Sequence, residues 1–264
     1  MKSGNLFWGL ALMALGGLFF LQARGLIAMA DIWGYFAPLL LILGGLWVLT
    51  GALRMQVSLD KAPSFSVALE NAQKLFFEFN TGMGQASFGG GAPPEVAVRG
   101  ASGAGMNVRS QREGDMLKVD VDAGPSVLPL LGPDGGGWRF ELSESALVSL
   151  EIDAGAASLD FDLRPLRLSS LKVECGASSI HMTLPERPEN TRIDFEMGAA
   201  SLDVTVPQGV ALRLKVEGGA NALTVDESRF PAMPDGAYQS TDFDAAPYKV
   251  EMSLEGGANS IQVH

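Results

Sequence analysis

The chain has 264 residues and carries 30 Asp and Glu side chains against 19 Lys and Arg, for a formal net charge of −11. This charge argues against nucleic acid as a partner, because phosphate binding needs a clustered basic surface. The single cysteine excludes a disulfide framework and a cysteine-based metal site. An apolar content of 47% excludes disorder for most of the chain.

The first 54 residues differ in composition from the rest of the chain. They hold three basic residues, Lys2, Arg24 and Arg54, and a single acid, Asp31. Their net charge is therefore +2. Since the whole chain carries −11, the other residues carry −13. The averages thus combine a weakly basic, apolar segment with an acidic, more polar one.

Two uncharged apolar stretches predict a transmembrane hairpin over residues 1–54, with spans at about 5–23 and 32–53. A helix needs about 20 apolar residues to cross the hydrocarbon core. A cleaved signal peptide is the alternative for the first span, but no small-residue cleavage site follows it and a second span comes at once. Basic residues at the outer ends of the hairpin favour cytoplasmic termini.

This segment resembles the paired-helix membrane region of the Lia-type, cell-wall-active antibiotic response family. The resemblance is carried by Leu15–Leu21 (LGGLFFL), by Trp33 and by Pro38–Trp47 (PLLLILGGLW). It implies a multi-pass protein of the bacterial plasma membrane, with both termini in the cytoplasm by the charge argument above.

The remainder of the chain is a repeat array. A Gly-Ala-x-Ser/Ala-Leu/Ile motif recurs with spacings of 21, 22, 21 and 38 residues, starting at Gly155, Gly176, Gly198, Gly219 and Gly257. Apolar and polar residues alternate on both sides of each motif, which predicts half-buried strands. The glycine marks a corner that needs close approach or unusual backbone angles. Each unit of about 21–22 residues is therefore strand, corner, strand and turn.

Two geometries fit such units, an antiparallel meander and a parallel β-solenoid. The constant period with identical corner chemistry favours the solenoid, a single-stranded β-helix whose equivalent residues stack about 4.8 Å apart. One coil buries about six apolar side chains, too few to offset the entropy of ordering its backbone, so the coils must stack.

The expected domain order follows from these patterns. After a linker at 55–62, we predict an irregular first part of the β domain at 63–142 and regular solenoid repeats at 143–264. The spacing of 38 predicts an insertion at about 229–247, whose prolines are typical of a surface loop. Within the irregular part, Gly82–Ala86 looks like a degenerate corner and Met116–Val121 like a further strand.

The repeat Leu-x-Val-Glu-x-Gly-Ala-x-Ser-Leu-x-Val, which recurs near the end of the chain at Gly256–Val263, resembles toast-rack and related adhesin-like β-solenoid domains. Such domains lie behind the same membrane hairpin in Lia-type proteins. The resemblance implies a bacterial membrane protein that senses or modulates cell-envelope stress, often through a two-component system. It offers no catalytic residues to transfer.

One column of outward side chains invites a catalytic interpretation. It takes the residue after each aligned Leu or Ile: Asp160, His181, Asp203, Thr224 and Gln262. The first and third would lie about 9.6 Å apart, near the upper limit for the two acids of an inverting glycosidase. A structural ladder is favoured instead, since a sugar site also needs a cleft and aromatic platforms, and the chain has three tyrosines.

Two other features have structural interpretations. The corner serines should hydrogen-bond corner backbone; they are Ser158, Ser179, Ser201 and Ser260. Cys175 should point into the core at a corner. The sequence therefore offers no catalytic residue, no cofactor-binding residue and no metal ligand.

These observations predict a non-enzymatic, membrane-anchored regulator or scaffold of the bacterial envelope-stress response, acting through protein–protein contacts. The expected partners are the membrane and a sensor kinase or another envelope-stress protein, with no cofactor and no nucleic acid. One alternative is a self-assembling structural protein, in which solenoid ends stack into homo-oligomers. Another is an extracellular adhesin-like module, which requires the opposite topology. An enzyme is the third alternative.

Overall fold

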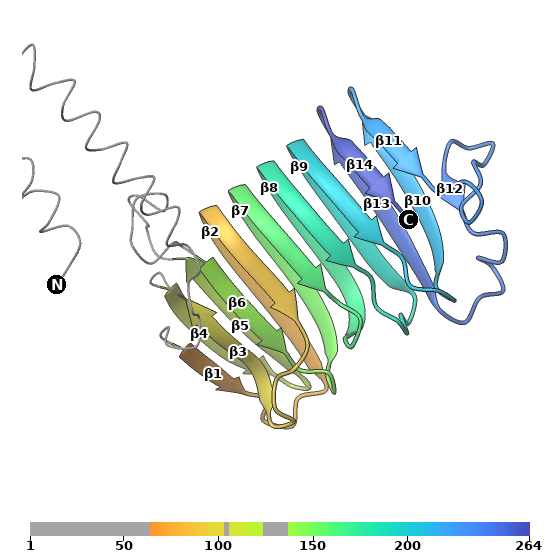
Figure 1. Cartoon of the computed structure of the whole chain (residues 1–264). Helices are drawn as coiled ribbons and strands as arrows, with labels where there is room; N and C mark the ends of the chain where they lie inside the picture. The colour runs from red at the N-terminus through yellow and green to blue at the C-terminus, as the bar shows by residue number, and fades with distance from the viewer. Residues whose placement is uncertain (1–63, 103–105, 124–136) are drawn as a thin grey trace, which may run out of the picture. The chain divides into compact units, whose positions relative to one another are not determined.

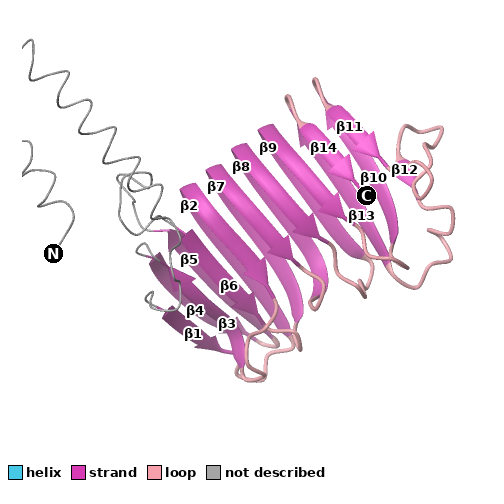
Figure 2. Cartoon of the chain, viewed as in Figure 1, coloured by secondary structure: helices cyan, strands magenta, loops and turns pink. Residues whose placement is uncertain are grey.

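The computed structural model of the chain describes residues 64–102, 106–123 and 137–264. Within them the predicted all-β class is confirmed, because every regular element is a strand (Figures 1 and 2). No helix of these residues has the length and hydropathy needed to cross a membrane.

Several predicted segments lie outside the described residues. They are the two membrane spans at 5–23 and 32–53, and the linker at 55–62. These assignments therefore stay predictions.

Fourteen strands of the described residues form one continuous sheet (Figure 1). In chain order they are β1 Ser64–Ala68, β2 Lys74–Gly89, β3 Val96–Ser102, β4 Met106–Glu113, β5 Met116–Ala123, β6 Gly137–Leu142, β7 Leu147–Asp162, β8 Arg167–Thr183, β9 Thr191–Thr205, β10 Ala211–Gly218, β11 Ala222–Val225, β12 Tyr238–Gln239, β13 Lys249–Gly256 and β14 Ser260–Val263. β2 pairs with β7, β7 with β8 and β8 with β9, and all three pairings are parallel.

The long strands must fold in half at the corner glycines. β7 has 16 residues, which would measure about 53 Å if straight. Yet β8 pairs with it in parallel after a connection of four residues, 163–166, which can span at most about 17 Å. The start and end of β7 therefore lie close together, and each long strand forms one coil of a solenoid.

The burial pattern locates the bend. In β7, alternate side chains are buried up to Ala154, and a new alternation begins at Ala157. The two residues between them, Gly155 and Ala156, are both exposed. This shift of parity turns the inward side chains of both half-strands toward the same core, as the corner prediction required.

The corner glycines form a ladder that no other residue fits. A Cβ added to Gly176 would lie 2.7 Å from the carbonyl oxygen of Gly155, and one added to Gly198 would lie 2.6 Å from that of Gly176. The same contact links Gly155 to Gly82, which confirms the degenerate corner expected in β2. Each glycine is therefore needed because the preceding coil passes directly against it.

The coils do not stack in sequence order. The last coil, β13–β14, pairs in parallel with β9 on one side and with β10–β11 on the other. Equivalent residues therefore stack as predicted, but the last two coils do not follow the order of the chain (Figure 1). β10–β11 follow β9 in the sequence but do not pair with it. β13–β14, which come later in the sequence, lie between them.

The returning segment contains the predicted insertion, and it is more than a surface loop. Phe230 is 1% exposed and Phe243 5% exposed, so both pack into the protein. Within the segment, β12 pairs antiparallel with β10 and covers part of its outer edge. β14 is therefore an internal strand of the sheet. Among the second halves of the coils, β11 is the edge strand at this end.

The opposite end of the solenoid is also closed by antiparallel strands. A coil made of β5 and β6 packs in parallel on β2. On its outer side β4 pairs with β5, β3 with β6, and β1 with β3, all antiparallel. These strands account for the irregular pattern before residue 143, and they protect the parallel coils from edge-to-edge association.

Candidate interaction surface

The first halves of the coil strands present a surface with aligned rows of charged side chains. We call this surface the first face. The row of side chains on it that lies nearest the corner is called the carboxylate row. In stacking order this row is Asp122, Asn80, Asp153, Glu174, Glu196, Glu255 and Glu217, joined by the pairing of consecutive strands. Six of these seven positions are acids, spaced about 4.8 Å apart by the sheet.

Neighbouring acids at this spacing repel by about 1 kcal/mol in water. Lysines of the adjacent row offset part of this repulsion. Lys172 pairs with Glu174 and lies 3.6 Å from Glu196. Its hydrogen bond to Glu174 raises the pKa of the Lys172 ammonium. Among the described residues Asp153 and Glu255 have no ion pair, so the row keeps excess negative charge.

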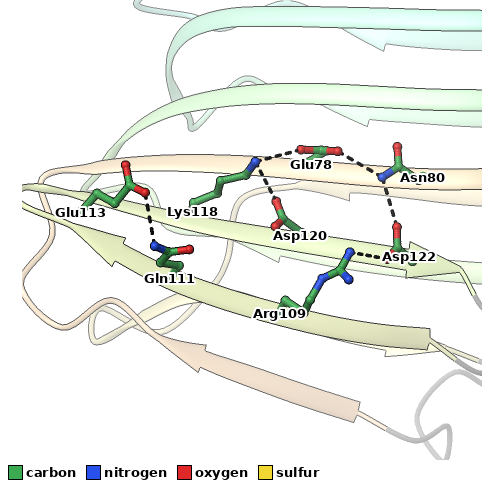
Figure 3. A network of polar contacts seen from close by, with 8 residues as sticks. All are labelled: Glu78, Asn80, Arg109, Gln111, Glu113, Lys118, Asp120 and Asp122. Atoms are coloured by element: carbon green, nitrogen blue, oxygen red, sulfur yellow. Dashed lines mark hydrogen bonds and ion pairs between the residues drawn. The ribbon is translucent and has the colours of Figure 1, made fainter.

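The row continues into a polar network at the N-terminal end of the first face (Figure 3). Arg109 of β4 donates to Asp122 at 2.7 Å, and the Asn80 amide donates to Asp122 and Glu78 at 3.2 Å each. Lys118 lies 3.3 Å from Glu78, and this hydrogen bond is the main reason that the pKa of Lys118 is raised. The amide of Asn80 thus lies between the acids Asp122 and Asp153 of the row and bonds to the first of them.

Asp194, in the row next to the carboxylate row, accepts hydrogen bonds from two side chains. Burial opposes its ionisation, but hydrogen bonds from Arg192 at 2.8 Å and Ser253 at 2.9 Å outweigh it. The pKa of Asp194 is therefore lowered. Because Ser253 belongs to β13, this carboxylate also ties the returning coil to β9.

We expect Asp194→Asn to lower the thermal midpoint at pH 7 and to have a vanishing effect in strong acid. A depressed folded pKa stabilises the protein above the unfolded value, near 3.9, and that contribution is lost as pH falls through the folded value. Melting curves of wild type and variant between pH 7 and pH 2 check this. Asp160→Asn is the control. A difference in midpoint that stays constant down to pH 2 would contradict the assignment.

The second halves of the coils present a second face, which carries the predicted column. Asp160 pairs with His181, His181 with Asp203, and Asp203 with Gln262, which in turn pairs with Thr224. His181 therefore lies between two acids as predicted, whereas the order of the last two members is reversed because β14 lies next to β9.

The reversal brings the two histidines of the chain to the same carboxylate. His181 Nδ1 lies 3.6 Å from one oxygen of Asp203, and His264 Nδ1 lies 3.4 Å from the other. Both distances exceed a normal hydrogen bond, so these are ionic contacts only when the rings are protonated. A shallow depression of about 220 Å³ includes Asp160, His181 and Asp203. The described residues contain no group of three or more His, Cys, Asp or Glu arranged to hold a metal ion.

The corner serines and Cys175 lie at the corners of the coils. Ser158, Ser179 and Ser201 do form a column, and Ser260 follows Ser201. The hydrogen bond to corner backbone comes instead from the preceding position, where Ser178 Oγ accepts from the Ala157 N–H at 3.3 Å. Cys175 is buried in the core as predicted, and burial raises the pKa of its thiol.

Sequence reasoning missed the carboxylate row, although a signal for it exists. An acid stands two residues before the corner glycine in all five repeats: Asp153, Glu174, Glu196, Glu217 and Glu255. Because equivalent residues of a solenoid stack, that recurrence alone places them in one outward line. Only Asp122 could not be found this way, since its coil is divided between β5 and β6.

Known proteins resemble this chain in family and in fold. Residues 56–205 match the family model described as the N-terminal domain of toast_rack, DUF2154. A crystal structure of a candidate cell adhesion protein from Clostridium sporogenes ATCC 15579 is similar, with a TM-score of 0.67 and 17% identity over 77% of this chain and 98% of that one. This likeness concerns the fold alone.

A second solved structure is more distant. A candidate adhesin from Bacteroides fragilis NCTC 9343 matches with a TM-score of 0.27 and 8% identity, over 77% of this chain and 97% of that one. That superposition is too poor to bear on the fold. No curated protein matches the chain at a significant level.

Proposed function

This chain belongs to the toast_rack family, DUF2154, because the model of the family's N-terminal domain matches more than half of the chain, and we propose its function on that basis. The proposed function is that of a non-enzymatic, membrane-anchored scaffold that regulates the bacterial envelope-stress response through protein–protein contacts. Its partner would be a membrane sensor kinase, or another envelope-stress protein, that presents a basic surface. Membership confirms the toast-rack part of the resemblance, and the Lia-type part belongs to this proposal.

The anchor is supported by the sequence. The apolar stretches at 5–23 and 32–53 are long enough to cross a bilayer, and the charge flanking them favours cytoplasmic termini. The solenoid would then lie at the cytoplasmic side of the plasma membrane. A cytoplasmic position suits contact with the signalling domains of a sensor kinase.

The observation that carries the proposal is the carboxylate row. Its acids stand on a continuous sheet at a fixed spacing, so a partner would meet them already ordered. Glu255 and Asp153 have no ion pair among the described residues and are free to accept one from outside. Charge complementarity of this kind favours specificity and fast association.

Neutralising the row should weaken capture of the partner. We expect the triple variant Asp153→Asn, Glu196→Gln and Glu255→Gln to recover roughly tenfold less sensor kinase after crosslinking in stressed cells. Three exposed ion pairs of about 0.5 kcal/mol each correspond to that factor. The measurement is quantitative mass spectrometry of the crosslinked, affinity-purified protein.

The matched control changes the same charge on the second face: Asp160→Asn, Asp162→Asn and Asp203→Asn. Equal loss of capture in both triples would point to net charge rather than to the row. Undiminished capture in the first triple would remove the row from the proposal.

An extracellular adhesin-like module is the second candidate, favoured by the similar fold of the Clostridium sporogenes protein. It requires the solenoid to lie outside the cell. Thiol labelling with a membrane-impermeant maleimide at an added cysteine, such as Ser260→Cys, separates the two. Labelling of intact cells supports the adhesin, and labelling only after lysis supports the cytoplasmic scaffold.

A further inference from the structure

We propose that the position between β9 and β10–β11 is a strand-accepting site, and that a second copy of this chain can fill it with its own β13–β14. In the structure the site is filled by the same chain. The proposed complex exchanges this coil between two copies. This inference goes beyond the proposed function, because it depends on the fold alone and not on the membrane anchor or on the partner proposed above.

The topology creates the site. β10 and β11 precede the donor coil in the sequence, yet their parallel hydrogen bonds are made only to that coil among the described residues. Until residues 249–263 arrive, β9 and β10–β11 both present open edges to the same empty position. Open parallel edges of this kind are templates for pairing with another chain.

A buried asparagine identifies the coil that fits. Asn259 is 5% exposed, and its side-chain oxygen accepts from the Ala200 N–H of β9 at 2.8 Å. Its side-chain nitrogen donates to Asn221 at 2.9 Å, on the opposite side of the site. The equivalent positions of the coils formed by β7, β8 and β9 are Ala157, Ser178 and Ala200, which cannot make both contacts.

The glycines of the donor coil complete the match. A Cβ on Gly257 would lie 2.7 Å from the Gly198 carbonyl oxygen, and one on Gly219 would lie 2.4 Å from that of Gly257. A Cβ on Gly256, the other corner glycine of the donor, would lie 2.4 Å from the Met197 carbonyl oxygen. A coil that fits must therefore carry two glycines followed, after one residue, by an asparagine. In this chain residues 256–259 of β13–β14 do so, and residues 218–221 of the accepting coil have the same Gly-Gly-Ala-Asn sequence.

Exchange of the coil between copies loses no contact, because β13–β14 make the same hydrogen bonds whether they fill the site of their own chain or that of a second copy. The balance between the two forms is then set by the concentration of neighbouring copies relative to the effective concentration of the attached donor. The segment from 226 to 248, which joins acceptor and donor, contains 23 residues and can follow the donor into a neighbour.

The test uses two full-length, differently tagged copies expressed in the same cells. One carries Ser201→Cys and the other Ser260→Cys, because these exposed residues are direct neighbours on β9 and β14. A short bismaleimide reagent should join the two tags at least tenfold more than in a control pair of Ser201→Cys and Ser158→Cys. The double variant Ser201→Cys/Ser260→Cys in one chain shows that the reagent reaches the pair.

A crosslink between the tags at that level, mapped by mass spectrometry to residues 201 and 260, supports exchange. Crosslinking no greater than in the Ser158→Cys control, while the double variant reacts within its own chain, would overturn the proposal. Both results are independent of kinase capture, so they do not depend on whether the proposed function is correct.

Discussion

The Gly198→Ala variant should lose about 1–3 kcal/mol of unfolding free energy, although it adds a single methyl group to an exposed position. The added Cβ would lie 2.6 Å from the Gly176 carbonyl oxygen, a distance that real Cβ atoms do not adopt. Backbone on both sides is fixed by parallel pairing, so the strain cannot be relieved by rotating a side chain. The Gly-Ala corners would have to separate.

Urea denaturation of the full-length protein, followed by circular dichroism in the β-sheet band, measures this loss. Ala199→Val is the matched control, because Ala199 is the next residue of the same corner and is exposed. We expect that control to change the unfolding free energy by less than about 0.5 kcal/mol. Equal stability of Gly198→Ala and wild type would show that the coils are not in contact at the corner glycines.

Truncation after Ala246 should destabilise residues 211–225, although these residues remain in the truncated chain. Without β13–β14, β10 and β11 lose their parallel neighbour on both half-strands. The only strand pairing left to this coil among the described residues is two residues of β10 with β12. We therefore expect amides of residues 211–225 to exchange at least about a hundredfold faster, because they then open locally.

Hydrogen exchange of full-length and truncated chains, read by mass spectrometry, checks this expectation. Residues 147–183 provide the internal control, since β7 and β8 keep both of their neighbours. Retained protection of 211–225 in the truncated chain would mean that this coil can stack directly on β9. That result would contradict the coil order described above.

The strands and corners of the solenoid were predictable because each is encoded locally. Alternation at Leu150 and Ile152, followed by Gly155-Ala156, specifies a half-buried strand and its bend within a few residues. The same reasoning predicted the all-β class and the inward position of Cys175, both of which the structure confirms. Such features need no knowledge of which coil lies next to which.

The coil order was not predictable from periodicity, because stacked coils with equal patterns are nearly interchangeable. The signal lies in the departures from the pattern. Residues 218–221 and 256–259 are both Gly-Gly-Ala-Asn, while the earlier corners have Ala or Ser at the asparagine position. An asparagine that must be buried needs a partner, and here Asn259 finds it in Asn221. Shared polar departures therefore identify neighbours that the apolar repeat cannot.

The two ends of the solenoid were missed for a different reason. β3, β4 and β12 pair antiparallel with their neighbours, so they share neither the repeat length nor the corner motif of the coils. Their positions depend on which edges need cover, which is a property of the assembled sheet. The meeting of His181 and His264 at Asp203 has the same origin, because it follows from placing β14 beside β9.

The proposed contact is between the carboxylate row of the first face and an envelope-stress protein. A photoreactive amino acid at Glu196 tests it most directly, with the same substitution at Ser201 as the control, because both residues lie on β9 but on different faces. In stressed cells we expect capture of a sensor kinase or another envelope-stress protein, identified by mass spectrometry, from position 196 and not from position 201. Capture from position 201 alone, or from neither position, would contradict it.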